Sequence, residues 1–384
     1  MTTRPLHILM TDPHLRGGGQ VRYVSNLARE LTRLGHRVTV GCKPDSVLVD
    51  HAQTAGCGIN NRFTFRGGLR PGCWLADVRE TKRFIRDEKP DILHVNGSQD
   101  HWVSGLTNRL LRRPVCVVRT RHNTYRVHDM LPNRVLNRNW TDFQIVVCEM
   151  VRESLSKQRA FDAARMCSVH NGVNVEEFKP NAAQRAEARA EFGYRDDDLV
   201  CGIAARLVRA KGHGFLLRAA ALLHDEFPRL RLLVLGRGDL KPELVKLANE
   251  LGIGDIVRFA GFRDDMARCT QAFDIGVQPS IDCDTSSFSL KEQMAEEKPV
   301  VCSDYGGLTE ILTDGVEGFI VPTRTVDPLA KAMKRLLTDA ELRRKMGTAG
   351  RNRVLKEFTL EVFAQRTVEA YYQALEIHGA HSAS

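Results

Sequence analysis

Two pairs of carboxylates in one short segment, residues 281–301, could do chemistry. Asp282 and Asp284 form an Asp-x-Asp pair, which can hold a divalent metal against a diphosphate. Asp284 and Glu292 lie eight residues apart and bracket several hydroxyl side chains at the predicted start of a helix. The segment could therefore be a metal site, a cradle for a sugar nucleotide, or an ordinary loop that enters a helix.

Two cations flank a loop further upstream, after the predicted strand at 199–205. Arg206 and Lys211 precede a predicted amphipathic helix, and Gly212 follows the lysine. Fixed cations at such a loop can neutralise a diphosphate and stabilise it as a leaving group. Exposed loop cations are common, but the position of these two after a sheet strand favours a function.

Glycines follow two of the predicted strands. Gly17, Gly18 and Gly19 come just before a predicted helix, where backbone N–H groups can approach an anion. Gly236 and Gly238 form a G-x-G turn, which is a weaker signal of the same kind. Neither turn is the GxGxxG fingerprint, so a nicotinamide-dependent dehydrogenase is the least expected class of enzyme.

Polar side chains at the ends of strands in the first half of the chain could contact a second substrate. Arg119, Arg121 and His122 follow the run PVCVV, and His94 and Asn96 close the run DILHVN. A histidine at such a place is either a structural residue or a polar contact to the substrate, and the residue types leave both readings open.

Short apolar runs alternate with helical patterns along the whole chain. In the first half the runs lie at 7–10, 37–42, 91–95, 114–120 and 144–148. In the second half they lie at 199–205, 230–236, 256–261, 273–280, 298–304 and 318–322. A polar stretch at 173–198 separates the two sets. This order predicts an α/β protein with two Rossmann-like doubly wound parallel-sheet domains that face each other across a cleft, where ligands bind.

The composition agrees with a two-domain soluble protein. The chain has 384 residues, 42% of them apolar and 27% charged, and this length is too great for a single core. No segment approaches the roughly 20 apolar residues of a transmembrane helix. The ten cysteines are scattered and form no CxxC pair, as in a reduced cytoplasmic protein.

The net charge of +9 is concentrated in one segment, between His101 and Trp140. Its arginines are Arg109, Arg112, Arg113, Arg119, Arg121, Arg126, Arg134 and Arg138, against the single acid Asp129. The segment is either a solvated basic face or a surface that attracts phosphates, a phospholipid membrane or an acidic glycan. Nucleic acid is not expected as a partner, because no aromatic-rich basic module accompanies the charge.

Taken in order, the motifs resemble those of the retaining family-4 glycosyltransferases of the GT-B fold. They are GGGQ, HNGVN, ARL-x3-KG, LGRGDLKPEL, VRFAG, D-x7-E, EQMA-x2-KPVV and GGLTE. Each motif is weak alone, but the ordered set covers nearly the whole chain. The resemblance implies an acceptor-binding domain at 1–168, completed by a returning C-terminal helix at about 358–384, and a donor-binding domain at 169–357.

The resemblance also implies a role for each donor-site residue. Arg206 and Lys211 would clamp the donor diphosphate, Glu292 would hold the ribose hydroxyls, and Asp284 would touch the transferred sugar. Backbone N–H groups of Phe288, Ser289 and Leu290 would contact sugar and phosphate. No metal and no other cofactor is expected, because the two cations take the place of a metal.

Other residues would complete the site by the same resemblance. The turn that contains Phe262 and Arg263 would meet the base, and Gly236 would lie near the donor. Gly18 and Gly19 would line the phosphate and the reacting centre. His122 matches the histidine near the sugar, and His94, Asn96, Arg119 and Arg121 would lie on the acceptor side.

The sequence departs from the family pattern at two positions. Asp284 stands where the family has glutamate and is one methylene shorter, so the contact to the sugar could differ. Glu297 stands where a glycine usually precedes the KPVV segment, so we expect either mild strain at a positive φ or a different helix cap.

The expected function is transfer of a hexose or N-acetylhexosamine, with retention at the donor carbon, from a nucleotide sugar to a glycan or lipid-linked acceptor. A UDP-sugar is favoured and a GDP-sugar is the alternative. The setting would be surface polysaccharide or lipopolysaccharide assembly, in the cytoplasm or on the inner face of the membrane. The alternatives are a sugar-nucleotide epimerase and a non-catalytic sugar-nucleotide-binding protein; the oligomeric state is not indicated.

Overall fold

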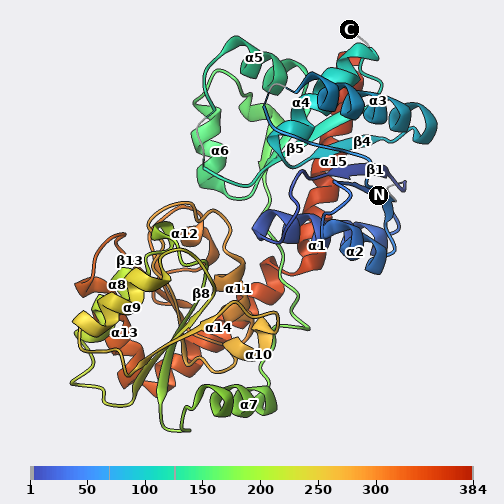
Figure 1. Ribbon diagram of the computed structural model, residues 1–384. Coiled ribbons are helices and arrows are strands. Elements are labelled where there is room, and N and C mark those ends of the chain that lie inside the picture. The colour runs from blue at the N-terminus through green and yellow to red at the C-terminus, as the bar shows by residue number, and fades with distance from the viewer. Residues whose placement is uncertain (1–3, 69, 125–126, 383–384) are drawn as a thin grey trace. The chain divides into compact units, whose positions relative to one another are not determined.

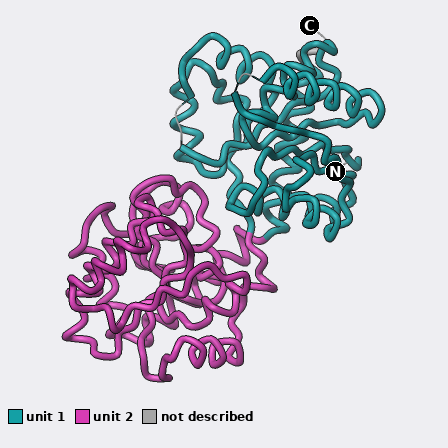
Figure 2. Tube along the Cα trace, viewed as in Figure 1, with its two compact units in different colours: residues 1–172, 360–384 teal, residues 173–359 magenta. Residues whose placement is uncertain are grey.

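The computed structural model describes residues 4–68, 70–124 and 127–382. The chain divides into two compact units (Figure 2). Unit 1 comprises Met1–Gly172 and Leu360–Ser384, and unit 2 comprises Val173–Thr359. These divisions fall slightly later in the chain than the expected ones after residues 168 and 357. No helix in the described ranges has the length and apolarity required to cross a bilayer.

Unit 1 contains a seven-stranded sheet in which every pairing is parallel. Its strands are β1 (His7–Thr11), β2 (Arg37–Gly41), β3 (Gly58–Asn60), β4 (Ile92–Val95), β5 (Cys116–Arg121), β6 (Phe143–Val146) and β7 (Met166–Ser168). Their order is β3-β2-β1-β4-β5-β6-β7. The order reverses between β1 and β4, so the loops after these two strands form a topological switch point, where ligands of doubly wound sheets bind.

Helices connect the strands of unit 1 (Figure 1). They are α1 (Gly19–Arg33), α2 (Leu48–Thr54), α3 (Pro71–Glu88), α4 (Ser98–Leu110), α5 (Leu131–Arg134) and α6 (Glu149–Ser156), with a π-helical turn at Val135–Asn139 and a 3-10 turn at Ala163–Arg165. The last helix of the chain, α15 (Leu360–Ser382), packs against α1, β5 and β6. The C-terminal segment is therefore part of unit 1.

Unit 2 contains a six-stranded sheet, again with only parallel pairings. Its strands are β8 (Leu199–Ala204), β9 (Leu230–Leu235), β10 (Val257–Gly261), β11 (Ile275–Gln278), β12 (Val300–Ser303) and β13 (Gly318–Val321), in the order β10-β9-β8-β11-β12-β13. The fold class expected from the sequence, two doubly wound parallel-sheet domains, is confirmed.

The helices of unit 2 cover both faces of its sheet. They are α7 (Ala182–Phe192), α8 (His213–Ala221), α9 (Lys241–Glu250), α10 (Met266–Thr270), α11 (Phe288–Ala295), α12 (Leu308–Ile311), α13 (Asp327–Thr338) and α14 (Ala340–Glu357), with a 3-10 turn at Arg209–Lys211.

Successive residues of each strand pack on opposite faces, because side chains alternate along a strand. In β9, Leu232 and Val234 pack with α8, α9 and α13, whereas Leu233 and Leu235 pack with α7 and α10. Apolar residues are thus needed at every position, which explains the continuous apolar runs in the sequence.

Glu297 follows α11 with a φ of 59°, in the left-handed region that glycine adopts without cost. Of the two outcomes that we expected, mild strain at a positive φ or a different helix cap, the structure shows the positive φ. The side chain is exposed, so the strain is not offset by burial.

Glu297→Gly should raise the free energy of unfolding of unit 2 by about 1 kcal/mol, because glycine relieves the left-handed strain. Urea unfolding followed by circular dichroism measures this. Glu297→Ala removes the carboxylate but keeps the Cβ, so it serves as the matched control and should give no increase. An equal gain from both variants would show that charge, not φ, sets the cost.

Candidate functional site

At the carboxyl edge of the unit 2 sheet, backbone hydrogen bonds join the loops that follow the strands. The Leu207 N–H, after β8, donates to the Arg237 carbonyl, after β9, at 3.0 Å. The Ile281 N–H, after β11, donates to the carbonyl of Ala210 at 2.8 Å. This edge is therefore a connected backbone framework rather than a set of separate loops.

Two glycines make this close approach possible. A Cβ at Gly212, which has a φ of 71°, would lie 1.8 Å from the Pro279 carbonyl oxygen. A Cβ at Gly236, with a φ of 134°, would lie 2.0 Å from the Ala205 carbonyl oxygen. Both positions require glycine for sterics and for backbone angle, so the role of Gly236 in this structure is to let the loops after β8 and β9 pack.

The Asp284 carboxylate lies at the centre of this framework. Its Oδ2 accepts hydrogen bonds from Lys211 Nζ at 2.8 Å, Ser280 Oγ at 2.6 Å and Gln278 Nε2 at 2.9 Å. The side chains of Lys211 and Asp284 are 16% and 4% exposed. Two of the residues that we predicted for the donor site are thus joined in a largely buried ion pair.

Gln278 and Ser280 were missed by the sequence reasoning, although a signal was present. Both are polar residues at the carboxyl end of a buried strand, in the run FDIGVQPS. Each is almost completely buried and serves to hold the Asp284 carboxylate.

The carboxylates of Asp282 and Asp284 have different surroundings. Asp282 is exposed, and its Oδ1 accepts from the Tyr305 hydroxyl at 2.8 Å, which lowers the pKa of this carboxyl. The two carboxylates of the Asp-x-Asp pair thus bind different partners.

Helix α11 begins directly after this loop. The Ser287 side chain caps it by accepting from the Leu290 N–H, and Phe288, Ser289 and Leu290 form its first turn. Glu292 is buried one turn later. The α11 N-terminus and Glu292 therefore belong to the same loop–helix unit as Asp284.

Lys291 was also missed, because a lysine within a predicted helix is ordinarily solvated. It is fully buried, and its Nζ donates to Ser286 Oγ at 3.0 Å. The rings of Phe288 and Phe358 lie 5.8 and 5.3 Å from this nitrogen. Cation–π contacts of this kind stabilise a desolvated ammonium group.

The remaining predicted cations of unit 2, Arg206 and Arg263, differ in the surroundings of their side chains. Arg206 is exposed. Arg263 pairs with Asp265 and Glu191, both at 2.8 Å, and these contacts raise its pKa. The Arg263 side chain is therefore held by two acids of the same unit.

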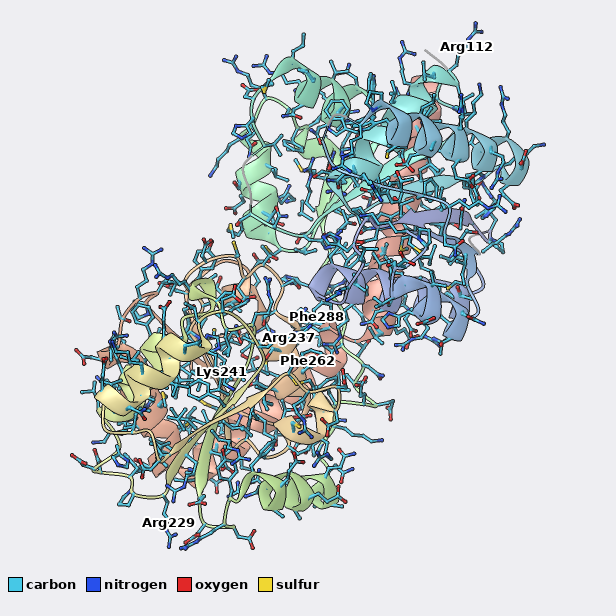
Figure 3. The ribbon with its side chains drawn as sticks, viewed as in Figure 1. Arg112, Arg229, Arg237, Lys241, Phe262 and Phe288 are labelled. Carbon is cyan, nitrogen blue, oxygen red and sulfur yellow. The ribbon has the colours of Figure 1, made fainter. Side chains whose placement is uncertain are left out.

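Phe262 is 56% exposed, next to Arg263, and offers an open aromatic face. The Arg237 guanidinium lies 4.9 Å from the centre of this ring, and Figure 3 labels both residues. A flat ring beside a cation can stack on a planar group of a ligand.

Unit 1 contains a separate cavity of about 550 Å³ after β1, β4 and β5. Its polar lining includes Gln20, Lys43, Asn96, Arg119, Arg121 and His122. No aspartate or glutamate lines it within the described ranges. Three of the predicted acceptor-side residues and the predicted histidine are thus brought together at the switch point of the sheet.

His122 lines this cavity. Its Nε2 lies 3.0 Å from Asn96 Oδ1, and its ring makes an edge contact with Tyr23. Burial and the charge of Arg119 lower the pKa of His122 well below its ordinary value. A neutral imidazole can contact a hydroxyl group as donor or acceptor.

His94, which we predicted on the acceptor side, does not line this cavity. The side chain is fully buried, with Nδ1 2.7 Å from the Tyr371 hydroxyl of α15 and Nε2 2.6 Å from Thr120 Oγ1. Burial lowers its pKa to about 3. His94 and Asn96 are two positions apart, so alternation along a strand does not separate them. His94 lies within β4 and bonds to α15, whereas Asn96 follows the end of the strand at Val95 and lines the cavity.

The glycine turn before α1 is open. Gly18 precedes this helix, which begins at Gly19, and a Cβ at either glycine would meet no heavy atom within 4 Å. Neither residue is required by packing of the described chain, in contrast to Gly212 and Gly236. The room beside them is compatible with the predicted approach of an anion.

The arginines of the basic segment between residues 101 and 140 have different surroundings. Arg119 and Arg121 line the cavity, Arg113 pairs with Asp142, and Arg134 pairs with Asp129. The exposed members are Arg109, Arg112 and Arg138; Arg126 lies outside the described residues. The segment is thus not a uniform basic face.

Lys211→Met should lower the free energy of unfolding of unit 2 by about 2–3 kcal/mol, because Asp284 would keep a buried charge without its counterion. Urea unfolding measures the loss. Arg206→Met, at an exposed position of the same loop, is the control and should change stability by less than about 0.5 kcal/mol.

Adding Asp284→Asn to Lys211→Met should recover part of that loss, because no buried charge would remain. A double variant less stable than Lys211→Met would contradict this electrostatic account of the pair.

Comparison with known proteins agrees with the geometry. Residues 184–353 match the family model of "Glycosyl transferases group 1", and residues 17–177 match "Glycosyltransferase Family 4". EpsD of Bacillus subtilis (strain 168) is 30% identical over 73% of this chain and 76% of its own length. A D-inositol 3-phosphate glycosyltransferase of Kribbella flavida is 29% identical over 94% of this chain and 92% of its own.

Solved structures share the fold. Anabaena Alr3699/HepE in complex with UDP superposes with a TM-score of 0.83 at 19% identity, covering 95% of this chain and 99% of that one. The same protein in complex with UDP-glucose gives a TM-score of 0.80 at 19% identity, with 95% and 98% covered. On the family models and the identity to EpsD, the chain belongs to the family-4, group 1 glycosyltransferases and is a GT-B enzyme.

Proposed function

We propose that this glycosyltransferase moves a hexose or N-acetylhexosamine from a UDP-sugar to a glycan or lipid-linked acceptor, with retention of configuration. The Lys211–Asp284 pair at the carboxyl edge of unit 2 carries the proposal. It joins the loop that carries Arg206 and Lys211 to the loop that leads into α11, so a diphosphate bound there could meet two cations and a helix N-terminus. The UDP and UDP-glucose complexes of HepE support a uridine donor over a GDP-sugar.

Lys211 can bind a donor without leaving Asp284. An ammonium group has three N–H donors, and the structure assigns one of them to Asp284 Oδ2. The others can reach a phosphate while the carboxylate keeps the side chain in place. Asp284 then acts mainly as a positioning residue, and its shorter side chain suits a carboxylate held back by Ser280 and Gln278.

The proposed step is breakage of the bond between the sugar carbon and the diphosphate oxygen. Arg206, Lys211 and the N–H groups of α11 would stabilise the charge that develops on this oxygen. Glu292 would hold the ribose hydroxyls, and Phe262 would lie against the base. The acceptor hydroxyl attacks the sugar carbon from the face that the diphosphate leaves, and its proton passes to the departing phosphate oxygen.

The cavity of unit 1 is the proposed acceptor site. Its volume of about 550 Å³ lies within the range of small-ligand pockets. Neutral His122, oriented by Asn96, would contact a sugar hydroxyl. A surface polysaccharide or lipopolysaccharide precursor would supply such an acceptor.

A panel of UDP-, GDP-, ADP- and dTDP-sugars tests the donor site. UDP-sugars should raise the melting temperature of the protein, and slow hydrolysis of the bound donor should release nucleotide. Lys211→Ala and Glu292→Ala should abolish both effects. Arg229→Ala is the matched control, because Arg229 immediately precedes β9 at the opposite edge of the sheet (Figure 3). Donor binding by Lys211→Ala equal to that of the parent would refute the site.

Turnover separates this function from its two alternatives. A sugar-nucleotide-binding protein would bind the donor but release no nucleotide with any acceptor. An epimerase would convert the donor sugar to its stereoisomer without an acceptor, which nuclear magnetic resonance of the product detects.

We also propose that the protein works at the inner face of the membrane. Met130 and Leu131, 60% and 72% exposed, stand at the start of α5. The exposed Arg138 follows within the same basic segment. Exposed apolar side chains beside cations are typical of surfaces that bind anionic lipid.

Flotation with vesicles should recover the protein when an anionic phospholipid is present and not with zwitterionic lipid alone. Met130→Gln combined with Leu131→Gln should reduce this recovery. Leu222→Gln, at an exposed leucine of unit 2, is the control and should not. If the parent protein does not float with the anionic vesicles, the proposed location at the membrane is wrong.

A further inference from the structure

We infer that the cavity of unit 1 holds an anionic group of the acceptor, a phosphate or a carboxylate, on the guanidinium of Arg119. The inference rests on the proposed function, because it takes this cavity as the acceptor site. It adds the chemical class of the acceptor, which neither the fold nor the family defines.

Arg119 carries the inference because it is a buried charge without a hydrogen-bonded counterion. The residue is 6% exposed and lines the cavity. Its Nε and Nη1 atoms are buried and have no hydrogen-bond partner among the described residues. A buried guanidinium left in this state is costly, and an oxyanion in the cavity would supply it with a counterion and a charge-assisted hydrogen bond.

Two other cations, Lys43 and Arg121, line the cavity together with Arg119. Arg121 donates through Nη2 to Asn137 Oδ1, and its buried Nε has no hydrogen-bond partner in the described chain. Burial and the charge of Arg119 lower the pKa of Arg121 to about 9. Like charges gathered in one cavity repel each other unless an anion lies between them.

Two buried acids near Arg119 are the competing explanation. Asp12 accepts from His14 and from Gln20 Nε2. Asp100 Oδ2 accepts from Thr11 Oγ1 and from two backbone N–H groups. Asp100 Oδ1 has no hydrogen-bond partner in the described ranges, so Arg119 could act only as its distant counterion. In that case an added anion would find no site.

Calorimetric titration of the full chain distinguishes the two explanations. Saturating UDP is present throughout, so that phosphate cannot bind in the donor site. The probes are glucose 6-phosphate, glucuronate and neutral glucose at constant ionic strength. We expect saturable binding of one or both anionic sugars, and the stronger of the two identifies phosphate or carboxylate as the group.

Arg119→Gln should weaken that binding by roughly ten- to a hundredfold, the effect of a lost charged hydrogen bond. Arg109→Gln is the matched control, an exposed arginine of the same unit outside the cavity, and should bind as the parent does. Lys43→Gln, at a half-buried position, should weaken binding by about two- to fivefold. It provides the test if Arg119→Gln fails to fold.

The outcomes separate the inference from the proposed function. Binding of UDP without binding of either anionic sugar would overturn the inference and leave the donor site intact. Anion binding unchanged in Arg119→Gln, or in Lys43→Gln if the former does not fold, would also overturn it. Failure of the parent to bind UDP or any other nucleotide would instead refute the proposed function.

Discussion

The proposed donor site depends on one electrostatic constraint, a carboxylate that is buried at the carboxyl edge of a parallel sheet. A charge in this position is tolerated only when donors surround it, and Asp284 receives three: Lys211, Ser280 and Gln278. These donors come from the loop after β8 and from the end of β11, so satisfying the charge also fixes both loops. The absence of a side chain at Gly212 lets these two loops approach each other, and Gly236 does the same for the loops after β8 and β9.

The fold could be predicted because its sheets are covered on both faces. Continuous apolar runs identified the long strands, but β3 and β7 have three residues each and are too short to show a pattern. Motif spacing placed the predicted donor-site residues on these loops of unit 2. What the spacing could not show is that Lys211 and Asp284 bind each other, since the contact joins residues 73 positions apart.

In the first half of the chain, the place of a residue along its strand decides whether its side chain lines the cavity. His94 lies within β4 and Asn96 directly follows it, and one is bonded to Tyr371 and the other to His122. Alternation gives two residues at this spacing the same face, and sequence alone does not say how much of that face a helix from the far end of the chain will cover. Likewise, the arginines at 113 and 119 look equivalent in the sequence, and only packing gives one of them an aspartate partner.

The path of the chain has a consequence for synthesis. Unit 2 is inserted into the sequence of unit 1. The two points at which the chain passes from one unit to the other lie next to each other, because the Val173 N–H donates to the Phe358 carbonyl at 2.8 Å. Domains usually fold in the order in which the ribosome makes them. Here the first 172 residues leave the ribosome without α15, so His94 and the apolar surface beneath that helix stay uncovered until the final segment emerges. Unit 2 can be complete by then, and the domain that begins first is the one that finishes last.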